Sequence, residues 1–378
     1  MKIAYISTYR DGTLAGHAAT QYILACEAAG LDVVCRPVSM GTIPQDQKPC
    51  PVAHLEQKNM QGVDVVIQHV LPQFYQYKRG VKNIGFLEWS TSDFNRSLWT
   101  ANCNLMDEIY TSCEQNREAA FRSGVTKPIR VIPRPCDILK FEQEYKPLDI
   151  GQTQGKLVFY SITSLTRNTN ISGLIRAYYR EFSARDDVVL VLCVQSEGKS
   201  EQDISTSLQK AIGDIKKSTH IYKNAKHYPP ILLIAQQLSP EETSRIHATC
   251  DIFVSAARGC VWSNAAHNAL GFGNPIIVSQ CGGFIDLLGK GSGGGWFVDG
   301  QTTPCFGMSE TTNYLYTGEE VWFDPNLIRL SEHMGMAYQM WKRDPNGTLK
   351  AMGKNAKKRA CEFSYANVGK IINGLLNE

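Results

Sequence analysis

The stretch from Cys250 to Phe284 carries the residues whose spacing best fits a chemical task. An apolar run of strand type, Ile252 to Val254, ends in a loop of small residues from Ser255 to Gly259. A short helical segment, a Gly-Asn-Pro turn, a second apolar run and the glycine pair Gly282 and Gly283 follow. This order is typical of a βαβ unit whose loops lie at the carboxyl ends of parallel strands, where α/β sheets bind nucleotides. The sequence therefore favours a nucleotide-handling enzyme, although this loop and helix contain no carboxylate.

Glycines that follow predicted strands are candidate phosphate-binding positions. Gly12 and Gly16 follow the first strand, as Gly282 and Gly283 follow a strand of the second half. Backbone N–H groups at a glycine turn that opens a helix favour an anion, whereas a glycine in a turn otherwise only supplies a positive φ. No GxGxxG opens either half and no GxxxxGK occurs, which disfavours a dehydrogenase and a P-loop hydrolase. A further run, Gly289 to Gly295, is interpreted as a flexible lid over the donor, since no helix clearly follows it.

Cationic and acid–base side chains supply the remaining candidates. Arg167 lies in the loop after the strand that opens the second half, where a guanidinium can bind an anion; the alternative is a solvated loop arginine. Glu88 and His69 each end an apolar strand of the first half. We expect Glu88 to orient a substrate hydroxyl and His69 to contact a substrate. A lone histidine at a strand end also fits a purely structural role.

The elements that must position these residues alternate between strand and helix. The predicted strands are Lys2–Ser7, Leu31–Cys35, Val63–His69, Ile84–Leu87, Glu108–Thr111, Arg130–Ile132, Leu157–Ser161, Val188–Val194, Ile231–Ile234, Ile252–Val254 and Ile276–Val278. Helices are predicted at His17–Ala29, Glu114–Ser123, from Ile171 onward, Glu241–Ala248, Ala265–Gly271 and over the last 50 residues. The aperiodic stretch Pro133–Lys156 is interpreted as a linker.

We therefore predict an α/β protein made of two Rossmann-like domains with parallel sheets and a central cleft. The first covers residues 1–150 and is joined by the C-terminal helix 356–378, and the second covers residues 151–355. With 378 residues, of which 43% are hydrophobic, the chain is long enough for two cores of this kind.

Composition excludes several classes of protein. With 39 basic and 36 acidic residues, the net charge of +3 offers no basic face for nucleic acid. The twelve cysteines form no CxxC pair, which favours reduced thiols of a cytoplasmic protein over disulfides or zinc sites. The first apolar run is too short for a signal peptide, and no apolar stretch reaches the roughly 18 residues of a membrane span. The basic run from Lys350 to Arg359 is expected to be a solvated helix face and not a membrane contact.

Several phrases of the chain follow a known pattern. They are FLEWSTSDF, MDEIYTSCEQNREAAFRSGV and IRVIPRPCDILKF in the first half, and LSPEETSRIHATCDIFVSAARG, ALGFGNPIIVSQCGGFIDLL and YTGEEVWFDPNLIRLSEHM in the second. Through these phrases almost the whole chain resembles the two-Rossmann-domain (GT-B) glycosyltransferases of the retaining family-4 type. Asp251 to Ser255 and Ala269 to Pro275 fit the motifs on either side of that family's acidic loop.

The acidic loop itself departs from the family pattern. The family carries two glutamates eight positions apart, and the matching positions here are Cys260 and Asn268. The second glutamate usually holds the ribose hydroxyls of the donor, and Asn268 can still donate and accept hydrogen bonds. Cys260 does not replace a carboxylate, and a shift of two residues would instead bring Arg258 to this position.

The resemblance implies a hexosyltransferase-like enzyme that uses a nucleotide-diphosphate sugar. It implies retention through a front-face transfer, with no metal or other cofactor, in which the leaving phosphate takes the proton of an unknown acceptor. An inactive homologue that binds nucleotide sugars or serves as a scaffold is the alternative that Cys260 and Asn268 favour. A two-domain enzyme such as a sugar-nucleotide epimerase also stays open, although no convincing acid–base set is found for it.

Overall fold

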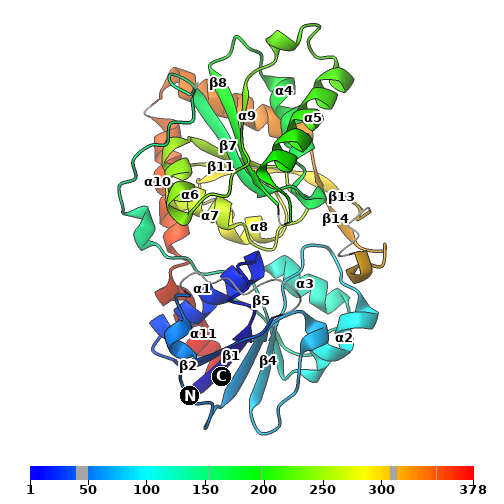
Figure 1. Cartoon of the computed structure of the whole chain (residues 1–378), viewed down its shortest axis with the longest axis vertical. Helices are drawn as coiled ribbons and strands as arrows, with labels where there is room; N and C mark the ends of the chain where they lie inside the picture. The colour runs from blue at the N-terminus through cyan, green and yellow to red at the C-terminus, as the bar shows by residue number, and fades with distance from the viewer. Residues whose placement is uncertain (40–49, 152, 197, 307–312, 346) are drawn as a thin grey trace. The chain divides into compact units, whose positions relative to one another are not determined.

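The computed structural model divides into two compact units of alternating strands and helices, which Figure 1 shows along the chain. It describes residues 1–39, 50–151, 153–196, 198–306, 313–345 and 347–378. Unit 1 consists of residues 1–137, 304–321 and 362–378, and unit 2 of residues 138–303 and 322–361. The chain thus first leaves unit 1 after Asp137, earlier than the boundary expected at residue 150, and it returns to unit 1 twice.

Unit 1 is built on a six-stranded sheet in the order β2-β1-β3-β4-β5-β6. All its neighbouring strands pair in parallel. The strands are β1 (Lys2–Ser7), β2 (Asp32–Pro37), β3 (Val65–His69), β4 (Lys82–Phe86), β5 (Glu108–Thr111) and β6 (Ile129–Val131). Its helices are α1 (Leu14–Ala28), α2 (Arg96–Leu105), α3 (Glu114–Arg122) and α11 (Tyr365–Leu376), with short turns η1 (Ala53–Leu55), η2 (Pro72–Phe74) and η6 (Asn313–Leu315).

Unit 2 repeats this architecture with strand order β12-β11-β10-β7-β8-β9. The strands are β7 (Leu157–Ser164), β8 (Val188–Gln195), β9 (Ile231–Ile234), β10 (Ile252–Ser255), β11 (Ile276–Ser279) and β12 (Gly295–Val298). The helices are α4 (Ile171–Glu181), α5 (Glu201–Thr219), α6 (Pro240–Thr249), α7 (Asn264–Gly271), α8 (Gly283–Leu288), α9 (Leu327–Arg343) and α10 (Thr348–Cys361), with turns η3 (Leu139–Phe141), η4 (Arg167–Thr169) and η5 (Ala225–His227). Strands β13 (Gly300–Pro304) and β14 (Val321–Pro325) form a separate two-stranded sheet.

Burial of apolar faces explains why these elements form. In α4, the residues Leu174, Ile175 and Tyr178 lie three and four positions apart and are buried against the sheet, as predicted from their spacing. Strand β8 is buried over nearly its whole length, which is typical of a central strand covered on both faces. The predicted class, α/β with two parallel sheets, is therefore confirmed.

The order of strands in each sheet determines where a ligand can bind. In unit 1 the chain goes outward from β1 to β2 and then crosses to β3 on the other side of β1. In unit 2 it goes outward from β7 to β8 and β9 and then crosses to β10 on the other side of β7. Loops at the carboxyl ends of two such strands diverge and leave a crevice, the usual ligand-binding position of open α/β sheets.

The stretch expected to be a linker is partly packed. Phe141 in η3 is only 5% exposed, and its ring lies 5.4 Å from that of Phe272. Gly271 approaches the same ring so closely that an added Cβ would overlap it. Residues from Ile138 onward therefore belong to the packing of unit 2, and the boundary between the units lies inside the predicted linker Pro133–Lys156.

The structure bears on two expectations from composition. The twelve cysteines, all within the described residues, form no disulfide with one another, as predicted from their spacing. In the part of the chain that the structure describes, no helix combines the length and apolar character needed to cross a bilayer.

The basic run on α10 is not wholly a solvated face. Lys357 donates to the main-chain oxygen of Phe141 at 2.8 Å. Arg359 donates to the main-chain oxygens of Leu287 and Asp286, at 2.9 and 2.5 Å. Two basic side chains of the run thus hold α10 against its neighbours, and the expectation of a purely solvated face is wrong for them.

Candidate functional site

Two predicted arginines meet at the crevice position of unit 2. The N–H of Arg258, in the loop after β10, donates to the main-chain oxygen of Asn168 at 2.6 Å. Its guanidinium Nη1 donates to the main-chain oxygen of Arg167 at 3.2 Å. The loops after β7 and β10 are therefore joined where the strand order reverses. The side chain of Arg167 is exposed on η4, so the structure places a cation at the carboxyl end of β7.

The side chain of Arg258 binds other side chains of unit 2. Its Nε lies 2.8 Å from the Asp324 carboxylate, and its guanidinium lies over the Trp322 ring at 5.4 Å. The main-chain oxygen of Arg258 also accepts the N–H of Phe323 at 2.8 Å. These contacts neutralise the charge and tie the loop after β10 to β14. Arg258 was predicted to bind the donor, and in the structure its side chain joins the loops after β7 and β10 to β14.

Cys260 lies against the glycine pair that follows β11. Its main-chain oxygen accepts the N–H of Gly283 at 2.8 Å. Gly282 has φ 54°, and a Cβ there would overlap the same oxygen. A Cβ on Gly283 would overlap the main-chain oxygen of Val261. The glycine pair thus allows the two loops to touch, and the N–H of Gly283 is occupied by this contact instead of facing an anion.

Asn268 lies in α7, the helix that follows the loop after β10. The helix begins after Ser263, whose side chain accepts the N–H of Ala266 and so satisfies an end of the helix. Asn268 is half-buried, and its main-chain oxygen accepts the N–H of Phe272 at 2.9 Å near the helix end. The side-chain amide of Asn268 can both donate and accept hydrogen bonds, which is the chemistry needed to bind a hydroxyl group. Arg167, Arg258, Cys260, Gly282 and Gly283 are thus brought together by loop contacts, and Asn268 follows them on the same βα connection.

In unit 1, Glu88 is held in a buried ion pair. Its Oε1 accepts from Nη2 of Arg134 at 2.5 Å, and its Oε2 lies 3.9 Å from Nε2 of His69. Burial alone raises the pKa of Glu88, but the charge and hydrogen bond of Arg134, together with the nearby His69 side chain, outweigh it and hold this pKa well below its usual range. Glu88 is therefore a carboxylate at neutral pH and does not act as a proton donor.

His69 is fixed by its neighbours. Its Nδ1 is hydrogen-bonded to the hydroxyl of Tyr5 at 2.9 Å. Its ring stacks on Phe86, with centroids 4.3 Å apart and an interplanar angle of 15°. The side chain is 5% exposed, so the sequence-based alternative of a structural histidine matches these contacts. His69 and Glu88 are nevertheless neighbours, as two ends of adjacent strands must be.

The loop after β1 contains the first glycine pair. Gly12 is exposed with φ 66°, and the N–H of Gly16 donates to the Thr13 side chain that caps α1. A Cβ on Gly16 would overlap the main-chain oxygen of Thr8, so glycine lets α1 approach the end of β1. The same loop holds Asp11, which is 8% exposed. Its Oδ1 is buried and has no hydrogen-bond partner.

Sequence reasoning missed Arg134 and Asp11. Arg134 follows β6 and is separated from Glu88 by 46 positions, so only the folded sheet reveals the pair. A basic residue between two prolines directly after a predicted strand was the available signal. Among the described residues, no three His, Cys, Asp or Glu side chains gather in a way that could hold a metal ion.

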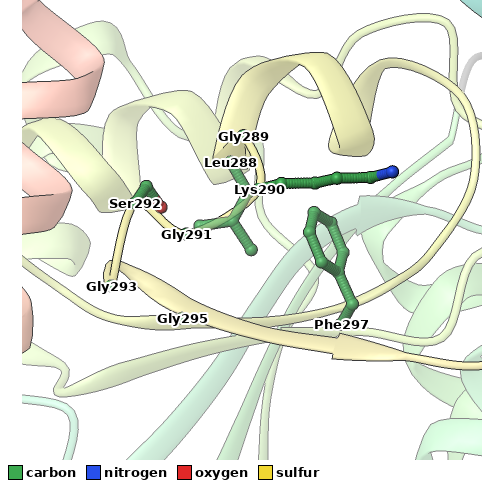
Figure 2. Close-up of a pocket in the computed structure, with 8 residues that line it drawn as sticks. All are labelled: Leu288, Gly289, Lys290, Gly291, Ser292, Gly293, Gly295 and Phe297. Atoms are coloured by element: carbon green, nitrogen blue, oxygen red, sulfur yellow. The ribbon is translucent and has the colours of Figure 1, made fainter.

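The glycine-rich run lies at the amino ends of the unit 2 strands. A pocket of about 390 Å³ lies here. Figure 2 shows the residues that line it, which are Leu288, Gly289, Lys290, Gly291, Ser292, Gly293, Gly295 and Phe297. The run connects α8 to β12, which is parallel to β11, and therefore lies at the amino end of the sheet. The loops described above lie at the carboxyl ends, so the interpretation of Gly289–Gly295 as a lid over the donor is wrong.

Solved structures share this fold. HepE from Anabaena, solved in complex with UDP, is 14% identical to this chain with a TM-score of 0.65 over 100% of both chains. OtsA, a trehalose-6-phosphate synthase, is 11% identical with a TM-score of 0.67 over 100% of this chain and 99% of that one. An α,α-trehalose-phosphate synthase (UDP-forming) from Burkholderia xenovorans, in complex with glucose-6-phosphate, is 13% identical with a TM-score of 0.61 over 83% of this chain and 74% of that one.

These likenesses establish the fold. The predicted GT-B class, with two Rossmann-like units and parallel sheets, is confirmed by neighbours that match the full chain. Neither a search of protein-family models nor a search of curated proteins gave a match. At these identities the activity does not follow from the likeness, and the expected central cleft stays a prediction.

Proposed function

We propose that this protein is a glycosyltransferase that moves a sugar from a nucleotide-diphosphate donor to an acceptor. Unit 2 binds the donor and unit 1 provides the acceptor side. The observation that carries the proposal is the junction of the loops after β7, β10 and β11 at the crevice position of unit 2, with the Arg167 side chain exposed beside it. The fold shared with HepE, whose structures contain UDP or UDP-glucose, supports the same placement.

Each donor-side residue has a distinct task in this proposal. Arg167 binds the diphosphate, because its guanidinium is the exposed cation of the junction. Asn268 hydrogen-bonds a hydroxyl of the donor. Arg258, Cys260, Gly282 and Gly283 hold the loops at the required distance through their own contacts. Positioning and charge stabilisation are the contributions that such a site makes to transfer.

The transfer is proposed to proceed with retention and without a metal ion. The acceptor hydroxyl attacks the anomeric carbon as its bond to the diphosphate breaks, and the leaving phosphate oxygen takes the hydroxyl proton. No protein carboxylate is needed on the donor side for this step. Glu88, an ionised carboxylate, accepts a hydrogen bond from the acceptor and orients it, and it does not donate a proton. His69 supports the position of Glu88.

Binding and hydrolysis of sugar nucleotides test the proposal. We expect one of the UDP-, GDP- or ADP-sugars to stabilise the protein against heat and to be hydrolysed slowly, with unchanged rates in the presence of a chelator. Binding without any turnover would instead support the alternative of an inactive nucleotide-sugar-binding protein. Absence of binding by every nucleotide contradicts both.

Arg167→Ala tests the donor site directly. We expect the nucleotide affinity to fall by about 10- to 100-fold, as for loss of a charge-assisted hydrogen bond of about 1.5–3 kcal/mol. Arg185→Ala is the matched control, since Arg185 is also exposed in unit 2 but precedes β8, at the amino end of the sheet. Titration calorimetry with UDP measures both. Equal affinities of the two variants would remove Arg167 from the site.

A further inference from the structure

Two arginines near the carboxyl ends of the unit 1 strands form ion pairs with carboxylates of the protein. Glu88 and Arg134 lie 2.5 Å apart, with side chains only 14% and 7% exposed. Arg10, which follows β1, binds both carboxylate oxygens of Glu56 through Nε and Nη2, at 2.7 and 2.9 Å. The charge of each guanidinium group is therefore balanced by a carboxylate of the protein.

Other polar atoms at these strand ends lack a partner. Oδ1 of Asp11 and Oγ of Ser7 are buried without a hydrogen bond in the structure. Ser7 ends β1 and pairs in register with His69, so these groups share the edge of the sheet at which Glu88 lies. A buried acceptor atom without a donor is costly, and a ligand hydroxyl satisfies it. An anion would instead bring negative charge to Asp11 and Glu88.

From these contacts we infer that the unit 1 site takes an uncharged, hydroxyl-bearing acceptor and excludes a phosphorylated one, because Glu88 already accepts from Nη2 of Arg134 and its carboxylate repels an anion there. This inference rests on the proposed function, for which it names the acceptor class. A phosphate group binds Arg134 only if Glu88 leaves its short charge-assisted bond. The displaced carboxylate would then remain in a largely buried place beside the new anion, which is strongly unfavourable. Glu88 and Arg134 are thus the pair that determines specificity.

Release of Arg134 provides the first test. In Glu88→Gln the neutral amide no longer neutralises the guanidinium, so we expect inorganic phosphate to bind about 10-fold or more tightly than to the wild-type protein. Thermal unfolding at matched ionic strength, with phosphate or chloride, measures this. The double variant Glu88→Gln with Arg134→Gln lacks the cation and should not respond to phosphate. Equal phosphate stabilisation of all three proteins would overturn the inference.

Paired acceptors provide the second test and need no variant. Wild-type protein with a UDP-sugar is offered glucose or glucose-6-phosphate, and mannose or mannose-6-phosphate, and UDP release is measured. A rise only with the neutral member of a pair supports the inference, and a rise only with the phosphorylated member overturns it. Titration of the same protein with UDP, GDP and ADP separates the two proposals. Lack of binding by all three contradicts the proposed function, whereas the phosphate response of the Glu88→Gln protein still decides the charge argument.

Discussion

Replacement of Gly282 by alanine tests the junction of the donor loops. Gly282 adopts φ 54° and ψ −146°, a conformation that costs a residue with a Cβ about 1–3 kcal/mol. The added methyl group would overlap the main-chain oxygen of Cys260, which accepts the N–H of Gly283 at 2.8 Å. Displacement of this oxygen loses that hydrogen bond, worth about 1 kcal/mol. We therefore expect Gly282→Ala to lower the free energy of unfolding by about 2–4 kcal/mol.

Gly291→Ala separates strain from overlap. Gly291 also has a positive φ, 74°, but nothing lies within 4 Å of an added Cβ, and it lies at the amino end of the sheet. Urea unfolding and titration calorimetry with UDP measure both variants. Gly282→Ala should be the less stable of the two and should bind UDP at least about 10-fold more weakly. Equal stability would refute the overlap argument, and an unchanged UDP affinity would refute a donor site at these loops.

Two further predictions concern stability. Arg258→Lys keeps a charge for Asp324 but loses the planar contact with Trp322 and the hydrogen bond to the Arg167 main-chain oxygen. It should therefore lower the free energy of unfolding by about 1–2 kcal/mol. A double-mutant cycle with Asp324→Asn that gives no coupling energy would contradict this. Burial lowers the pKa of His247 to about 3, below its unfolded value near 6.5. As the pH falls, the unfolded state therefore takes up the proton first, and the free energy of unfolding decreases below about pH 6.5. His247→Gln should remove about 2 kcal/mol of the stability difference between pH 7 and pH 5 in urea unfolding, and an unaltered difference would show that the histidine is not buried as described.

Strands buried on both faces were predictable from the sequence. The apolar runs near Val65 and Val188 are strands in the structure because hydrophobic periodicity is a local signal. Helix α1 begins at Leu14, one turn before the predicted His17, because the Thr13 side chain accepts the N–H of Gly16. Helix α5 was not predicted, although Ser200 starts a capping box that the sequence displays.

Short edge elements and the site were less predictable. Strand β12 is a four-residue edge strand that begins at Gly295, too short for a pattern to stand out. The candidate glycines were found, but their closeness to Cys260 depends on two loops meeting in space. The Glu88–Arg134 pair joins the ends of strands that lie two places apart in the sheet. Such contacts require the fold, because no local spacing encodes them.

The order of the chain segments affects how unit 1 folds during translation. Cys136 donates its N–H to the main-chain oxygen of Phe363 at 2.9 Å, and Tyr365 in α11 donates to Gln21 in α1 at 2.5 Å. Gly369 comes so near the main-chain oxygen of Ala25 that a side chain would not fit. Unit 1, whose sheet is synthesised first, therefore receives the helix that packs on α1 last, after all of unit 2 has been translated. Until then the surface of α1 that α11 buries is available to chaperones or to neighbouring nascent chains.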